Sequence, residues 1–242
     1  MSLLSIVQFA ARQCRFNSIP TSALSSTDPD VQQMVAFAQN AGDELQERAG
    51  WRNLKLEFNV IGDGVSTLYT LPADWQRLCP SDKSPIGALI SLARPTIPLI
   101  GPVNDEWLNQ MKALPAFPAY PVWRLIGGNI EIWPALANAE VVQSWYFSNA
   151  WISNASITAR QQTWQADTDF SLIHERIIQW YCVWNWKASK GLDYAEDFRR
   201  YEMTFDRQAG QEDTGRVIST STAVINDDTF WPGQIGSGYV GP

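Results

Sequence analysis

The chain has 242 residues, enough for one sizeable hydrophobic core or for one core that carries an inserted module. A hydrophobic content of 45% excludes global disorder, and a formal net charge of −7 excludes the basic surface that is typical of nucleic-acid-binding proteins. Charged residues make up only 18% of the chain, whereas tryptophan occurs 12 times. This balance is typical both of an aromatic core and of a surface that is covered by protein partners.

The cysteines and the apolar runs indicate a protein that is synthesised in the cytoplasm. Cys14, Cys79 and Cys182 are far apart and lack the spacing of a zinc site, so we expect reduced thiols. The first 14 residues lack the basic start and the cleavage site of a signal peptide. The chain has no run of about 18 apolar residues, so we expect no membrane span.

Two helices are predicted near the N-terminus. Residues 2–14 carry apolar side chains at helical spacing, which predicts a short amphipathic helix. Thr27 or Asp28 as N-cap and Pro29 in the first turn predict the start of a second helix, because both positions suit the unpaired N–H groups there. We expect this helix to end within residues 48–50.

The middle of the chain has the pattern of a β-module. Alternating apolar residues flank Gly62-Asp63-Gly64 and predict a hairpin, and a second hairpin is predicted around Gly127-Gly128. Ten of the 14 prolines lie between residues 72 and 134, which argues against long helices there. We expect one short helix within residues 104–111 and a further strand over residues 139–147.

Helical periodicity returns in the last third of the chain. Asp167, Thr168 or Asp169 is expected to cap a third helix. The second half of this helix is apolar on nearly all sides, so we expect it to be buried on several sides. Gly191 is expected to end it, and Asp193 is expected to start a fourth helix.

These elements predict an α+β fold. The helix pairs at the two ends of the chain are each too short to bury their own apolar stripe, so we expect them to form one antiparallel helical bundle from residues 1–50 and 160–209. Residues 51–159 are expected to form an inserted small β-sandwich module. Residues 210–242 are rich in Gly, Ser, Thr and Asp, which predicts an extended C-terminal tail.

Catalytic and metal-binding patterns are weak, and we expect neither an enzyme nor a cofactor. His174-Glu175 begins the HExxH zinc pattern, but Ile178 occupies the position of the second histidine. Asp74 and Glu131 provide two carboxylates for a glycosidase-like site, although their spacing does not favour one. A hydrolase whose catalytic residues are dispersed along the sequence is the least favoured function.

The tryptophans of the β-module leave a second alternative open. Trp75, Trp107, Trp123 and Trp133 would form a carbohydrate-binding platform if they were exposed together. The competing interpretation is that they fill the core of the module or a subunit interface. A carbohydrate- or receptor-binding tail module is therefore the alternative function.

Five segments of the sequence resemble those of phage head-to-tail adaptor proteins. "LYTLPADWQRL" at residues 68–78 resembles the adaptor signature Y-x-L-P-x-D-[FW]-x-R-[LI]. "DEWL" at 105–108 and "GGNIEIWPAL" at 127–136 are similar to a short helix and a hairpin of these proteins. "WYFSNAWI" at 145–152 and "SKGLDYAEDFRRYE" at 189–202 resemble the strand and the helical segment that follow. The resemblance covers roughly residues 27–207.

The resemblance implies a structural virion protein at the head–tail interface. Such adaptors form a homo-oligomeric ring, usually of twelve copies, under the portal protein. The ring extends the DNA channel, contacts the tail or nozzle protein, and touches double-stranded DNA only as passing cargo. An acidic protein suits such a channel, because like charge lets DNA pass without binding.

The resemblance also assigns two sets of contact residues as expectations. Adaptor tails commonly reach onto the portal, so the apolar residues of the tail are expected to dock there: Val217, Ile218, Val224, Ile225, Phe230 and Trp231. A helix that is apolar all round fits a protomer flanked by others in a ring, so we expect Trp180, Trp184 and Trp186 at the subunit interface.

Overall fold

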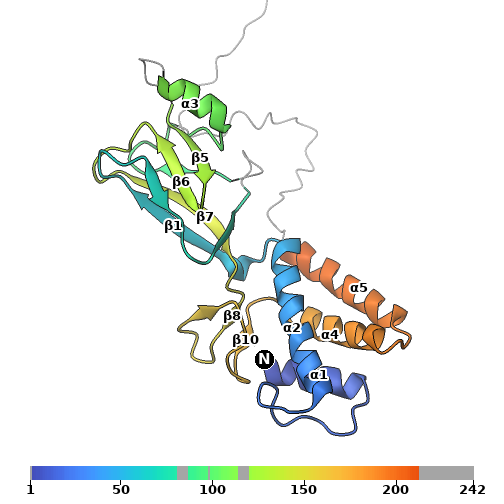
Figure 1. The fold of residues 1–242 in the computed structure, drawn as a ribbon. Helices are drawn as coiled ribbons and strands as arrows, with labels where there is room; N and C mark the ends of the chain where they lie inside the picture. Colours follow the sequence, from blue (N-terminus) through green and yellow to red (C-terminus); the bar gives the residue numbers. More distant parts are fainter. Residues whose placement is uncertain (1, 81–86, 98, 114–119, 213–242) are drawn as a thin grey trace, which may run out of the picture. The chain divides into compact units, whose positions relative to one another are not determined.

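The computed structural model describes residues 2–80, 87–97, 99–113 and 120–212, which form two compact units (Figure 1). The described residues of the first unit are 2–56, 74–77 and 146–212, and those of the second are 57–73, 78–80, 87–97, 99–113 and 120–145. Residues 146–159, which the sequence pattern places in the inserted module, group with the first unit in this division. Helices and antiparallel sheets occur together, so the predicted α+β class is confirmed.

The first unit begins with the two predicted helices, α1 (Leu3–Gln13) and α2 (Pro29–Arg48). Asp28 is the N-cap of α2, and its Oδ1 accepts a hydrogen bond of 2.9 Å from the backbone N–H of Asp30. Pro29 occupies the first turn, where a missing N–H costs nothing. The local signals of the sequence therefore place the start of α2 correctly.

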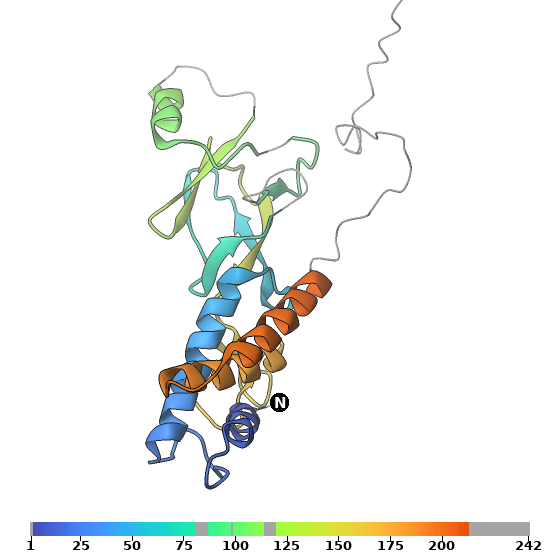
Figure 2. The ribbon, with the colours of Figure 1, turned by 90° about the vertical axis from the view of Figure 1, so that its right-hand side faces the viewer.

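Helix α4 (Glu175–Ser189) lies at the centre of this unit and packs against α1, α2 and α5 (Ala195–Glu212). In Figure 2, α5 faces the viewer and passes in front of α4. Because three helices of its own chain pack against α4, most of its apolar circumference is buried within the unit. Gly191 ends the helix with a φ of +67°, and Asp193 Oδ1 accepts the N–H of Ala195 at the start of α5.

The start of α4 differs from the prediction. Its N-cap is His174, which makes no capping bond with its side chain, and the predicted capping carboxylates serve loops instead. Asp167 accepts hydrogen bonds from the backbone N–H groups of Ala23 and Leu24, so it fixes the loop between α1 and α2. Asp169 accepts from the backbone N–H groups of residues 165 and 166. A carboxylate can accept hydrogen bonds from the free N–H groups of a loop as well as from those of a helix start. Here the loop N–H groups bind the carboxylates that were expected to cap α4.

A small sheet adjoins the helices within the first unit. It consists of β8 (Ile152–Ser153) between β9 (Arg160–Gln161) and β10 (Phe170–Ser171), all antiparallel. Trp151, which precedes β8, is fully buried, and its Nε1 donates to Asp43 Oδ1 on α2 at 3.0 Å. This contact fastens the small sheet to the helices.

The second unit is built from short strands and one helix. Its elements are β2 (Leu68–Thr70), β4 (Ile90–Ser91), α3 (Asp105–Ala113), β5 (Val122–Ile126) and β6 (Asn129–Trp133), together with parts of β1 (Lys55–Ile61), β3 (Trp75–Leu78) and β7 (Val141–Ser148). The unit border runs through β1, β3 and β7. One sheet has the order β1-β7-β3, with β4 paired to β7, and the other has the order β2-β6-β5.

The two predicted hairpins have different outcomes. The hairpin β5–β6 is confirmed: Ile126 pairs with Asn129, and Gly127 and Gly128 both have the positive φ that the tight turn requires. The hairpin around Gly62 is wrong, because β1 pairs with β7 whereas β2 pairs with β6. Gly62 lies so close to residue 137 that a Cβ would come within 2.3 Å of its carbonyl oxygen.

Candidate interaction surface

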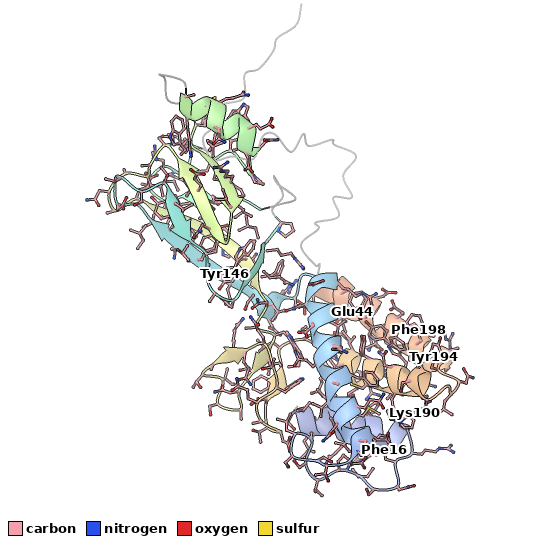
Figure 3. The ribbon with its side chains drawn as sticks, viewed as in Figure 1. Phe16, Glu44, Tyr146, Lys190, Tyr194 and Phe198 are labelled. Carbon is pink, nitrogen blue, oxygen red and sulfur yellow. The ribbon has the colours of Figure 1, made fainter. Side chains whose placement is uncertain are left out.

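An exposed aromatic patch lies at the turn between α4 and α5. It consists of Trp184, Tyr194 and Phe198. The side chains of Tyr194 and Phe198 lie near each other at the outer side of the helices (Figure 3) and are 43% and 41% exposed. The ring of Trp184 is 6.2 Å from that of Tyr194 and 5.2 Å from that of Phe198. Large apolar groups held open to solvent in a cluster are typical of protein contact surfaces.

Hydrogen bonds and an ion pair hold the residues that lie beneath this patch. Tyr181 donates its hydroxyl to Glu44 at 3.0 Å, and Arg48 donates to the Tyr201 hydroxyl at 2.8 Å. Arg48 also forms an ion pair with Glu202 at 3.1 Å. Burial, together with the nearby Glu44 carboxylate, raises the pKa of Tyr181 to about 12, so this hydroxyl stays a donor throughout the neutral range.

The three predicted interface tryptophans differ in their exposure. Trp180 packs edge-on against Phe9 at 5.4 Å and is 7% exposed, and Trp186 packs against Phe16 at 5.2 Å and is 9% exposed. Trp184 is half-buried and contributes to the aromatic patch. Their contact with a neighbouring subunit stays a prediction, and Trp184 offers the most surface for it.

An arginine groove, which the sequence did not predict, lies between α1 and α4. This open depression of about 480 Å³ is lined by Ser5, Gln8, Phe9, Arg12, His174, Glu175, Arg176 and Gln179. The guanidinium group of Arg176 stacks 4.5 Å above the ring of Phe9 and 5.4 Å above that of Trp180. The groove arises from the packing of two helices that are far apart in sequence, so no local pattern could reveal it.

The polar residues of the adaptor-like segment 68–78 have structural partners in the first unit. Asp74 accepts hydrogen bonds from the Tyr146 hydroxyl at 2.9 Å and from Ser148 Oγ at 2.6 Å. Arg77 donates to the carbonyl groups of residues 47 and 49, where α2 ends, and its guanidinium lies 5.0 Å from the ring of Phe147. Arg77 thus satisfies carbonyl groups that the end of a helix leaves free.

Glu131 and His174, which the sequence raised as candidates for catalysis or metal binding, have the following surroundings. Glu131 is buried and bonds to Lys112 and to Arg124 Nε, the latter at 2.7 Å. Burial favours a raised pKa, but the hydrogen bonds from Lys112 and Arg124 outweigh it and hold the pKa of Glu131 below its ordinary value. His174 is exposed at the start of α4, and the described residues contain no group of metal-ligating side chains.

Two buried glutamates predict how the second unit responds to acid. Glu140 resembles Glu131: burial opposes ionisation, yet bonds from Ser91 and Arg94 lower its pKa. A carboxyl group whose pKa is lower in the folded than in the unfolded state stabilises the fold above the unfolded pKa and loses this effect as the pH falls. We therefore expect the urea midpoint of this unit, followed by tryptophan fluorescence, to fall below about pH 4.5.

The matched variants for this prediction are Glu131→Gln and Glu140→Gln. Each is expected to lower the urea midpoint at pH 7, because the neutral amide loses the charged pairing that the buried carboxylate makes with Arg124 or with Arg94. Each should also weaken the change of the midpoint between pH 7 and pH 4. An unchanged acid response in both variants would contradict the assignment.

The tryptophans considered for carbohydrate binding do not form an exposed platform in the second unit. Trp123 is fully buried, Trp133 is half-buried, and Trp107 on α3 is 41% exposed. Trp75 belongs to the first unit. The structure therefore offers no support for the carbohydrate-binding alternative.

Two further expectations concern the tail and membranes. The six apolar residues expected to dock onto the portal, Val217 to Trp231, lie outside the described residues, so the docking stays a prediction. Among the described helices, none has the length and apolar content needed to cross a bilayer.

Comparison with known proteins assigns the chain to a family. Among curated proteins, none matches the sequence. The family model described as SU10 adaptor protein matches residues 1–225, which is nearly the whole chain. The phage-adaptor character that the five sequence segments imply is therefore confirmed at the level of the family. The chain belongs to the SU10 adaptor protein family and is a phage adaptor-type structural protein.

Proposed function

We propose that this protein is a head–tail connector subunit that assembles with further copies into a ring under the portal protein. The ring, with twelve copies as the expected number, extends the DNA channel and docks the tail or nozzle protein. DNA passes through it as cargo and is not held. The protein acts by assembly in the virion, not by catalysis.

The aromatic patch is the observation that carries this proposal. Tyr194 and Phe198 keep about two fifths of their surface open to solvent, and both pack against the ring of Trp184. A protein that worked alone would gain nothing from such side chains, whereas a subunit contact buries them and gains roughly 25 cal/mol per Å² of apolar surface. The family match and the net charge of −7 support the same role.

The test is electron microscopy of the purified protein alone and mixed with its portal protein. We expect ring-shaped particles in the mixture, with the adaptor ring stacked on the portal ring. Phe198→Ser and Tyr194→Ser together should reduce the fraction of complete rings, since they remove the apolar part of the patch. Single copies that bind the portal without contacting one another would contradict the ring, and a failure to bind the portal would contradict the connector role.

A further inference from the structure

Two arginines of the arginine groove have no carboxylate partner among the described residues. Arg12 is exposed on α1, and its side chain makes no hydrogen bond or ion pair with the described residues. Arg176 donates to the side-chain oxygen of Gln179 at 3.1 Å and stacks on two aromatic rings. Stacking restricts the guanidinium plane before any partner arrives, which lowers the entropy lost on binding.

The chemistry of this groove suits a carboxylate. A guanidinium group recognises carboxylates through paired N–H···O bonds. The groove lining holds two arginines but one carboxylate, Glu175, and it adds the hydrogen-bonding side chains of Ser5 and Gln8. In a chain with a net charge of −7, such a local excess of cations marks a place for an acidic partner.

The same unit carries an acidic strip on the outer side of α2. The strip consists of Asn40, Asp43, Glu44 and Glu47, which are all exposed and follow the spacing of one helix face. The carboxylate of Glu47 makes no hydrogen bond or ion pair within the described residues. That of Asp43 accepts only from neutral groups, the side chains of Gln39 and Trp151.

The arginine groove and the acidic strip belong to different faces of the helical unit. The groove is lined by residues of α1 and α4, whereas the strip lies on α2. The buried side of α2 faces α4, because the Met34 carbonyl contacts Cys182.

On α2 itself, the acidic strip points away from the core. The buried residues of this helix, Val31, Met34, Ala38, Ala41, Gly42 and Leu45, form one stripe. The strip positions fall on the other side of the helix axis by the same periodicity. One copy thus presents cations on one face and carboxylates on a different face.

We propose that the acidic strip of one copy docks in the arginine groove of the next copy. Such a head-to-tail contact between two different faces repeats from copy to copy and closes into a ring when the rotation per step allows it. The inference deepens the proposed function, on which it rests, by naming two charged faces that contact each other in addition to the aromatic patch. Glu47 and Asp43 of one copy meet Arg12 and Arg176 of its neighbour.

Sedimentation of the full chain over a concentration series tests this contact. The wild-type chain is expected to self-associate, and association should weaken as sodium chloride rises from about 50 mM to about 500 mM, since screening acts on ion pairs. Reversing the groove charges with Arg12→Glu and Arg176→Glu should weaken association about tenfold or more. Asn40→Lys and Glu47→Lys replace three negative charges of the strip by two positive and two negative ones, so they should weaken association as well, and neither pair removes a buried bond of the strip.

Mixing the two variants provides the decisive measurement. The glutamates placed in the groove of one variant can pair with the lysines placed on the strip of the other, and the unchanged faces are complementary too. An equimolar mixture should therefore recover association, although each variant alone does not. Arg207→Glu, an exposed charge reversal on α5 outside the groove, is the matched control and should leave association unchanged.

Each outcome separates this inference from the proposed function. If the mixture fails to recover association while the variants keep the helical circular dichroism of the wild type, the pairing of these faces is wrong. If the reversed groove loses binding to a fluorescent DNA duplex without any change in self-association, the groove receives phosphate and the inference is also wrong. In both cases portal binding by wild-type rings would leave the connector function intact.

Discussion

A chain that lacks residues 216–242 is expected to lose portal binding while it keeps its helical unit. The deletion removes all six apolar residues expected to dock: Val217, Ile218, Val224, Ile225, Phe230 and Trp231. It begins beyond Glu212, where α5 ends, because the Glu212 carboxylate accepts the backbone N–H of Arg52 at 2.9 Å and fastens the helix end. The described contacts of the helical unit all lie at or before residue 212.

The measurement is the dissociation constant for the portal protein, with circular dichroism as the check on folding. We expect affinity to fall roughly 100-fold or more, since apolar anchors carry most of the energy of such contacts. Deleting only residues 232–242 removes none of the six residues and should leave affinity unchanged. Equal affinity of the wild-type chain and the longer deletion would place the portal contact on the folded units.

Helix starts were predictable where their signals are local. Asp28 and Pro29 act on N–H groups within one turn, so the sequence alone locates the start of α2. The same reasoning misplaced the start of α4, because Asp167 and Asp169 bond to loop N–H groups. A capping residue is recognisable from its type, but its partner depends on which free N–H groups the tertiary fold brings near it.

Strand pairing shows the same limit more strongly. The turn at Gly127-Gly128 joins neighbouring strands, and its two positive φ values are a local demand that glycine meets. At position 62 only a glycine fits, because the backbone of residue 137 lies too close for a Cβ atom. The strands before and after Gly62 belong to different sheets. A glycine-rich segment between two alternating patterns therefore predicts a turn but not which strands pair.

The candidate contact surfaces, too, were predictable from the sequence only in part. The aromatic residues of α4 and α5 stand out in the sequence, but the sequence does not show which of them are exposed. In the structure Trp180 and Trp186 are buried by their own chain, whereas Trp184 is half-buried. The arginine groove was missed because Arg12 and Arg176 are 164 positions apart in sequence. Only the packing of α1 on α4 brings them into one depression.

The contact between Gly42 and Trp151 is expected to have the largest effect on stability. Gly42 lies in the middle of α2, where alanine would normally stabilise the helix by about 1 kcal/mol. A Cβ at this position would come within 2.1 Å of Trp151 Cζ2, and the indole is fully buried. Gly42→Ala should therefore destabilise the first unit by about 1–3 kcal/mol, opposite in sign to the helix propensity.

Trp151→Ala should cost more, about 3–5 kcal/mol in the free energy of unfolding, because it opens a cavity beside α2 and removes the bond to Asp43. In the double variant the alanine at position 42 gains space. The stability lost by the double variant should therefore be smaller, by at least about 1 kcal/mol, than the sum of the losses of the two single variants. Urea unfolding followed by helical circular dichroism gives all four free energies. Gly210→Ala on α5, where a Cβ meets nothing within 4 Å, is the matched control and should stabilise slightly. If Gly42→Ala were to stabilise the protein like this control, α2 and the segment that carries Trp151 would not pack as closely as the structure shows.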